Sequence, residues 1–62
     1  MTEILYGENI YALLGKASRM LKRAGRRDLI EKMNKEVHKC KSYDEAFSVI
    51  IKTLDEAGIN PF

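Results

Sequence analysis

Basic side chains are the most concentrated chemical groups in this sequence of 62 residues. Ten of them lie between positions 16 and 41 against three acidic residues, so this basic segment carries a net charge of +7, whereas the whole chain carries +2. Guanidinium and ammonium groups at this density bind the phosphates of nucleic acids or the carboxylates of an acidic protein surface. The candidate residues for such binding are Lys16, Arg19, Lys22, Arg23, Arg26 and Arg27.

Three interpretations of the basic segment are open: docking of an acidic protein, binding of nucleic acid, or a solvated face that complements a helix dipole. Two features weaken the nucleic-acid interpretation. The third predicted helix begins with Asp44 and Glu45, which phosphates repel, although a helix-turn-helix places that helix in the major groove. A ribbon-helix-helix strand reads base edges, yet the N-terminal arm offers only Thr2 and Glu3. Nucleic-acid binding is therefore the alternative to an acidic protein partner.

Residues for metal binding or catalysis are few. His38 and Cys40 are the only soft ligands, and side chains two positions apart on a helix diverge by about 200°, so no metal site is expected. The carboxylate pairs at 44–45 and 55–56 have no base beside them, and no phosphate-binding glycine loop occurs. The sequence thus predicts no enzyme, no cofactor and no small-molecule substrate.

The elements that carry these side chains are predicted from hydrophobic spacing. Apolar residues recur at helical intervals in three segments, which predicts an all-α fold: a compact three-helix unit (about 9–24, 26–40 and 43–57) with a short extended N-terminal arm. No repeat or long linker divides the chain, so residues 1–62 are expected to form a single helical domain. The apolar positions of the first helix are Ile10, Leu13, Leu14, Ala17, Met20, Leu21 and Ala24.

Helix ends are marked by specific residue types. Asn9 can cap the first helix, and Gly25 is placed to end it in a left-handed conformation. Ser42 and Glu45 match the capping box, in which the serine accepts from the glutamate amide and the carboxylate reaches back to the serine amide. Gly58 ends the third helix, with the next residue, an isoleucine, able to complete a Schellman ending.

The third helix has more apolar surface than one core contact needs. From Val49 to Ile51, its apolar positions span an arc of about 200°. A short chain stabilises itself by only about 3 to 5 kcal/mol, so we expect a homodimer that covers Ile51 or Val49 and can include the N-terminal arm. The candidate self-association residues are Ile4, Tyr6, Val49 and Ile51. The alternative is a monomer in which Ile4 and Tyr6 fold back over the same arc.

A cytoplasmic protein is expected. No apolar run approaches the roughly 18 residues that cross a bilayer, and the acidic start lacks the basic and apolar regions of a signal peptide. A single cysteine excludes an intramolecular disulfide. Stability must therefore come from packing or from a partner chain.

Overall fold

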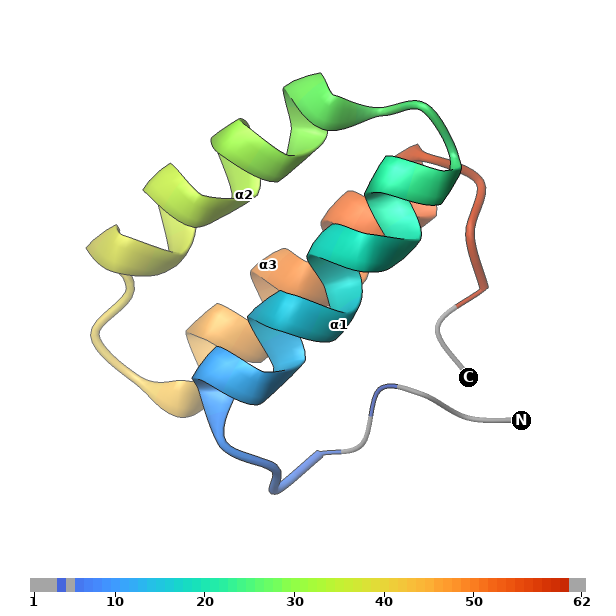
Figure 1. Ribbon diagram of the computed structural model, residues 1–62. Coiled ribbons are helices and arrows are strands. Elements are labelled where there is room, and N and C mark those ends of the chain that lie inside the picture. Colours follow the sequence, from blue (N-terminus) through green and yellow to red (C-terminus); the bar gives the residue numbers. More distant parts are fainter. Residues whose placement is uncertain (1–3, 5, 61–62) are drawn as a thin grey trace.

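The computed structural model describes residue 4 and residues 6–60, which form three helices and, within that part of the chain, no strand. These are α1 (Ile10–Arg23), α2 (Arg27–Lys39) and α3 (Tyr43–Glu56) (Figure 1). Each begins and ends within one residue of the predicted range, so the all-α three-helix prediction is confirmed. The extended arm falls mostly on residues 1–3 and 5, which lie outside the described residues.

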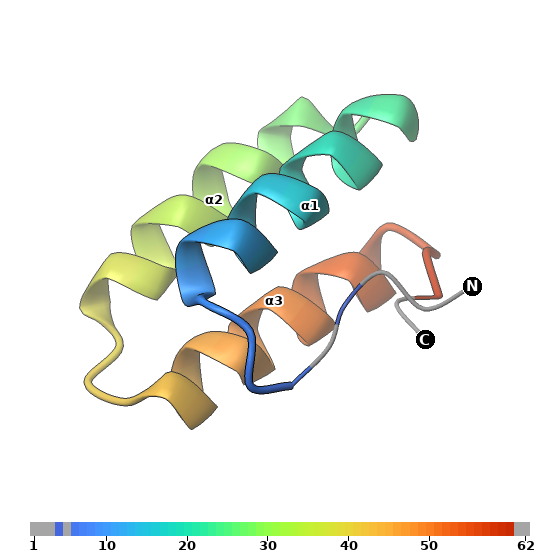
Figure 2. The same cartoon turned by 60° about the horizontal axis from the view of Figure 1, so that its bottom comes forward.

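The helices form a compact bundle in which each contacts the other two. α1 and α2 run antiparallel as a helical hairpin, and α3 packs across the same side of both (Figures 1 and 2). The C-terminal ends of α1 and α3 lie at the end of the bundle where α2 begins (Figure 1). The residues between α1 and α2 therefore form a corner at one end of the molecule.

The core is built from the apolar stripes predicted by the spacing. Leu13, Ala17 and Leu21 of α1 are fully buried, since one residue in every three or four returns to the same helix face. Each buried aliphatic side chain of this kind contributes about 1.5 to 3 kcal/mol. The largest fully buried side chains come from all three helices and from the N-terminal segment: Ile4, Leu13, Leu21, Met33, Ile50 and Leu54.

Both ends of α1 are closed as predicted. The side-chain oxygen of Asn9 accepts a hydrogen bond from the amide of Tyr11 at 2.8 Å. Gly25 adopts a left-handed φ of 75°, and the amide of Arg26 donates to the carbonyl of Leu21 at 2.9 Å, which is the Schellman geometry. The turn that follows α1 is thereby fixed by backbone hydrogen bonds.

The ends of α3 agree with the prediction except at one bond. The Ser42 hydroxyl accepts from the Glu45 amide at 3.2 Å, and the amide of Ile59 donates to the carbonyl of Leu54 at 2.9 Å. The Glu45 carboxylate, however, accepts from the amide of Lys41 rather than that of Ser42. The long glutamate side chain reaches one residue past the cap and ties the α2–α3 connection to α3.

The described N-terminal residues lie against α3. Ile4 is fully buried in the core. The ring of Tyr6 meets the rings of Tyr43 and Phe47 edge to face, at centroid distances of 5.2 and 5.1 Å. Its hydroxyl donates to the carboxylate of Asp44, and this bond raises the pKa of Tyr6. At Ile4 and Tyr6 the chain thus covers part of its own third helix.

Candidate functional site

Two of the six candidate cations are engaged within the chain. The ammonium group of Lys16 lies 2.9 Å from the carboxylate of Glu8, which belongs to the segment before α1. The guanidinium of Arg26 lies 3.3 Å from the carboxylate of Asp28, and this hydrogen bond lowers the pKa of Asp28. Lys16 and Arg26 are both half-buried. They are therefore less available to a partner than the sequence suggests.

The other four candidates form what we call the basic corner: Arg19, Lys22, Arg23 and Arg27. All four are exposed, and none has an ion pair or hydrogen bond from its side chain within the described residues. Three lie on the last turns of α1, where Arg19 and Arg23 are separated by about 6 Å along the axis, and Arg27 begins α2. The turn at Gly25 holds these two groups of cations side by side.

Two acidic groups of α2 and α3 pair with lysines outside the basic corner. Glu56, at the end of α3, lies 3.8 Å from Lys32, and Glu31 lies 4.0 Å from Lys35 on α2. These two carboxylates therefore do not pair with the cations of the basic corner. Exposed pairs of this kind contribute at most about 1 kcal/mol each to the stability of the fold. Their importance here is that they occupy two carboxylates.

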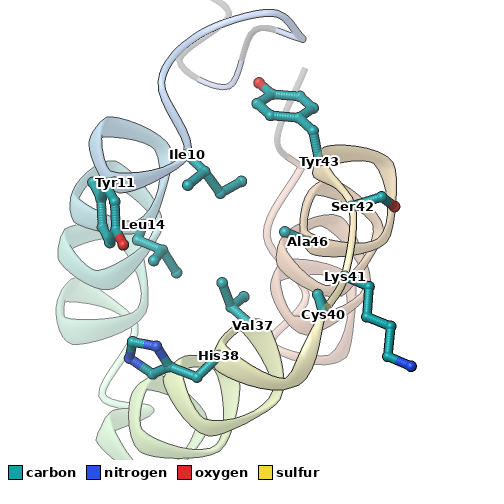
Figure 3. Close-up of a pocket in the computed structure, with 10 residues that line it drawn as sticks. All are labelled: Ile10, Tyr11, Leu14, Val37, His38, Cys40, Lys41, Ser42, Tyr43 and Ala46. Carbon is teal, nitrogen blue, oxygen red and sulfur yellow. The ribbon is translucent and has the colours of Figure 1, made fainter.

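An open pocket of about 390 Å³ lies at the opposite end of the α1–α2 hairpin (Figure 3). Its apolar walls are Ile10 and Leu14 of α1, Val37 of α2 and Ala46 of α3. The two ends of the hairpin thus differ, since one is charged and the other is hollow. The remaining lining residues are Tyr11, His38, Cys40, Lys41, Ser42 and Tyr43.

Sequence reasoning missed this pocket. Helical periodicity assigns Ile10, Leu14 and Val37 to buried faces, yet it does not show that the helices leave space between them. The one local signal is Ala46, a small side chain at a position where α3 meets both neighbours. A larger residue there would fill part of the space.

His38 and Cys40 lie at the end of α2 that borders the pocket. α2 ends at Lys39, and its C-cap Cys40 keeps a helix-like φ of −72°, so the two side chains still point about 200° apart around the helix axis. Both residues line the pocket, from opposite sides (Figure 3). The half-buried thiol of Cys40 donates to the carbonyl of Glu36 at 3.3 Å. The described residues contain no group of three or more ligands suited to a metal ion.

The four candidate self-association residues do not form one surface. Ile4 belongs to the core of its own chain, and Tyr6 is 64% exposed beside α3. Val49 and Ile51 are half-buried and pack against the core. Being two positions apart on α3, they point about 200° apart around it, so one flat partner surface cannot cover both.

Comparison with known proteins identifies no relative. The chain matches no protein-family model, and no curated protein or solved structure shows significant similarity to it. Among the described helices, none is long and apolar enough to cross a membrane. Any functional proposal therefore rests on the surface of this chain.

Proposed function

We propose that this chain is a small non-enzymatic, cytoplasmic interaction module whose basic corner docks an acidic surface of another protein. The observation that carries the proposal is the selective pairing of charge. Lys16 and Arg26 are held by carboxylates of their own chain, whereas the four cations of the basic corner are exposed and have no ion pair within residues 4 and 6–60. Such a cluster attracts carboxylates and accelerates their encounter.

A protein partner is favoured over nucleic acid by what surrounds the corner. The exposed aromatic side chain of α1 is Tyr11, about 12 Å along the helix axis from Arg19, so it cannot stack bases whose phosphates bind at the corner. The exposed carboxylates of Asp44 and Glu45 begin α3 at the opposite end of the bundle, so they repel a phosphate backbone that runs along the molecule from the corner. Phosphate binding at the same four cations is the alternative function.

A non-enzymatic role is proposed because the polar groups that sequence alone offers for catalysis have structural partners. The Asp44 carboxylate accepts from Tyr6, and that of Glu45 accepts from the Lys41 amide. The Cys40 thiol donates a hydrogen bond to a backbone carbonyl. None of these groups has an adjacent base among its described hydrogen-bond partners, as nucleophilic or acid–base catalysis needs.

Self-association remains a separate proposal. It rests on one half-buried position of α3, either Val49 or Ile51, since Ile4 lies inside the core of its own chain. It does not depend on the basic corner.

Binding of charged probes tests the proposed function. The wild-type chain and the double variant Arg19→Glu/Arg23→Glu are titrated by fluorescence anisotropy with a glutamate-rich peptide and with a mixed-sequence DNA duplex, at several salt concentrations. The matched control, Lys39→Glu/Lys52→Glu, makes the same change in net charge at two exposed lysines that have no ion pair in the described chain.

We expect the peptide to bind, the corner variant to lose about tenfold or more in affinity, and the control to lose about twofold. Tighter binding of the duplex, with a log–log salt slope of about −3 to −4, would establish phosphate binding instead. No binding of either probe at low salt would remove both functions.

A further inference from the structure

The basic corner and the pocket are the two ends of one seam between α1 and α2. Tyr11 and Lys22 are eleven residues apart on α1, and Arg27 and His38 are eleven residues apart on α2. Eleven residues are close to three full turns, so each pair lies on one row of its helix. Because the helices are antiparallel, Tyr11 and His38 border the pocket (Figure 3), while Lys22, near the end of α1, and Arg27, at the start of α2, lie at the corner.

The middle of the seam is uncharged on α1 and carries one paired carboxylate on α2, since Glu31 lies on the same row as Arg27 and 4.0 Å from the ammonium group of Lys35. Ser18 lies on the same row of α1 as Lys22, and Asn34 lies on the same row of α2 as Arg27. Both are half-buried and uncharged. These two uncharged side chains lie between the charged end and the hollow end of the seam, which are about 17 Å apart along the helix axis.

The hollow end suits a bulky apolar side chain. Four of its ten lining residues are aliphatic, and its volume of about 390 Å³ is in the range of pockets that bind small ligands or anchoring side chains. Its rim adds the exposed His38 and Lys41, whose side chains have no partner in the described chain. Both ends of the seam are therefore complementary to a partner that carries carboxylates.

We propose that the seam docks an acidic amphipathic segment of another protein, with carboxylates at the basic corner and a large apolar side chain anchored in the pocket about 17 Å away. That separation corresponds to about eleven residues of helix, or about five of extended chain. The inference rests on the proposed function and adds the anchor and its spacing. Apolar burial at the pocket supplies affinity that salt does not remove.

A set of helical peptides tests the spacing. Each peptide carries a cluster of three glutamates and one tryptophan, which is placed either eleven or seven residues from the cluster. Each spacing is made with the tryptophan before and after the glutamates, and a counterpart of each peptide has alanine in place of the tryptophan. Seven residues keep the same helix face but shorten the separation to about 10 Å. Affinities are measured by anisotropy, and contacts by amide chemical shifts of the isotopically labelled full chain.

In one orientation, the eleven-residue peptide is expected to bind about tenfold more tightly than its alanine counterpart and to shift the amides of Leu14, Val37 and Ala46. The seven-residue peptide should show no such gain. The variant Tyr11→Ala, at a 73% exposed position, should lose most of the gain yet bind the alanine peptide as the wild type does.

Equal binding of all peptides with shifts confined to the corner would overturn the anchor while leaving the proposed function intact. If the tryptophan gives the same gain in affinity at both spacings, the proposed spacing along the seam would be overturned. Failure of every peptide to bind at low salt would remove the proposed function, and this inference with it.

Discussion

The hydroxyl group of Tyr43 donates a hydrogen bond to the backbone carbonyl of Glu8 at 2.5 Å and accepts one from the amide of Gly7 at 3.0 Å. This single side chain, at the first turn of α3, therefore holds the segment that precedes α1. The carboxylate of Glu8 in turn pairs with Lys16. By holding the backbone at Glu8, Tyr43 thus favours the ion pair of Glu8 with Lys16 over a pair with another cation of α1.

Removing this hydroxyl should destabilise the fold. Tyr43→Phe keeps the ring contacts but leaves two backbone groups of the N-terminal segment without their partner, for which we expect a loss of about 1 to 3 kcal/mol in the free energy of unfolding by denaturant titration. Tyr11→Phe is the control, because the Tyr11 hydroxyl has no hydrogen bond within the described chain. Equal stability of the two variants would show that the Tyr43 bonds contribute nothing.

The phenol of Tyr6 should titrate at higher pH than an ordinary tyrosine, because its hydrogen bond to Asp44 raises its pKa. Since the folded chain retains a proton that the unfolded chain releases, this bond stabilises the fold fully below pH ~10. The contribution is lost as the pH rises through the pKa of the folded state. NMR titration of the tyrosine rings should show the pKa of Tyr6 falling in Asp44→Asn; an unchanged pKa would contradict the bond.

Two glycines should respond to alanine in opposite directions. Gly25 has a φ of 75°, so Gly25→Ala is expected to cost about 1 kcal/mol in left-handed strain at the corner. Gly15 lies inside α1 with open space where a β-carbon would be, so Gly15→Ala should stabilise the fold by about 1 kcal/mol. Thermal unfolding followed by circular dichroism compares them, and a stabilising Gly25→Ala would be inconsistent with the described turn.

Self-association through α3 has its own test in solution mass. The proposal expects light scattering to give about twice the 7.1 kDa chain mass at low and moderate salt. Ile51→Lys should then return the mass to that of one chain while preserving helicity, because Ile51 is only half-buried in the described structure. A wild-type chain that is monomeric at both salt concentrations would refute self-association and leave the basic corner unaffected.

The helices could be predicted because their signals are local. Ser42 and Gly25 act on amides and carbonyls within five residues, and the burial of Leu13 and Leu21 follows from spacing along one helix. The pairing of Lys16 with Glu8 was not predicted, because it depends on how the chain before α1 is folded back.

The pocket depends on space between helices rather than on any residue pattern. Cys40 illustrates the same limit, since its place in the pocket wall depends on how α1 and α3 lie beside the end of α2. The sequence shows that the candidate cations are concentrated in one segment, whereas their division into paired and unpaired residues required the tertiary contacts of the described chain.

The contact of the N-terminal segment with α3 has a consequence for synthesis on the ribosome. Ile4 and Tyr6 emerge early, but Tyr43, Asp44 and Phe47, the side chains that contact Tyr6, are translated almost forty residues later. The α1–α2 hairpin can form from neighbouring residues while this segment still lacks its partner. The first described residue of the chain is therefore among the last to reach its native surroundings, and nascent chains should expose Ile4 until α3 has left the exit tunnel.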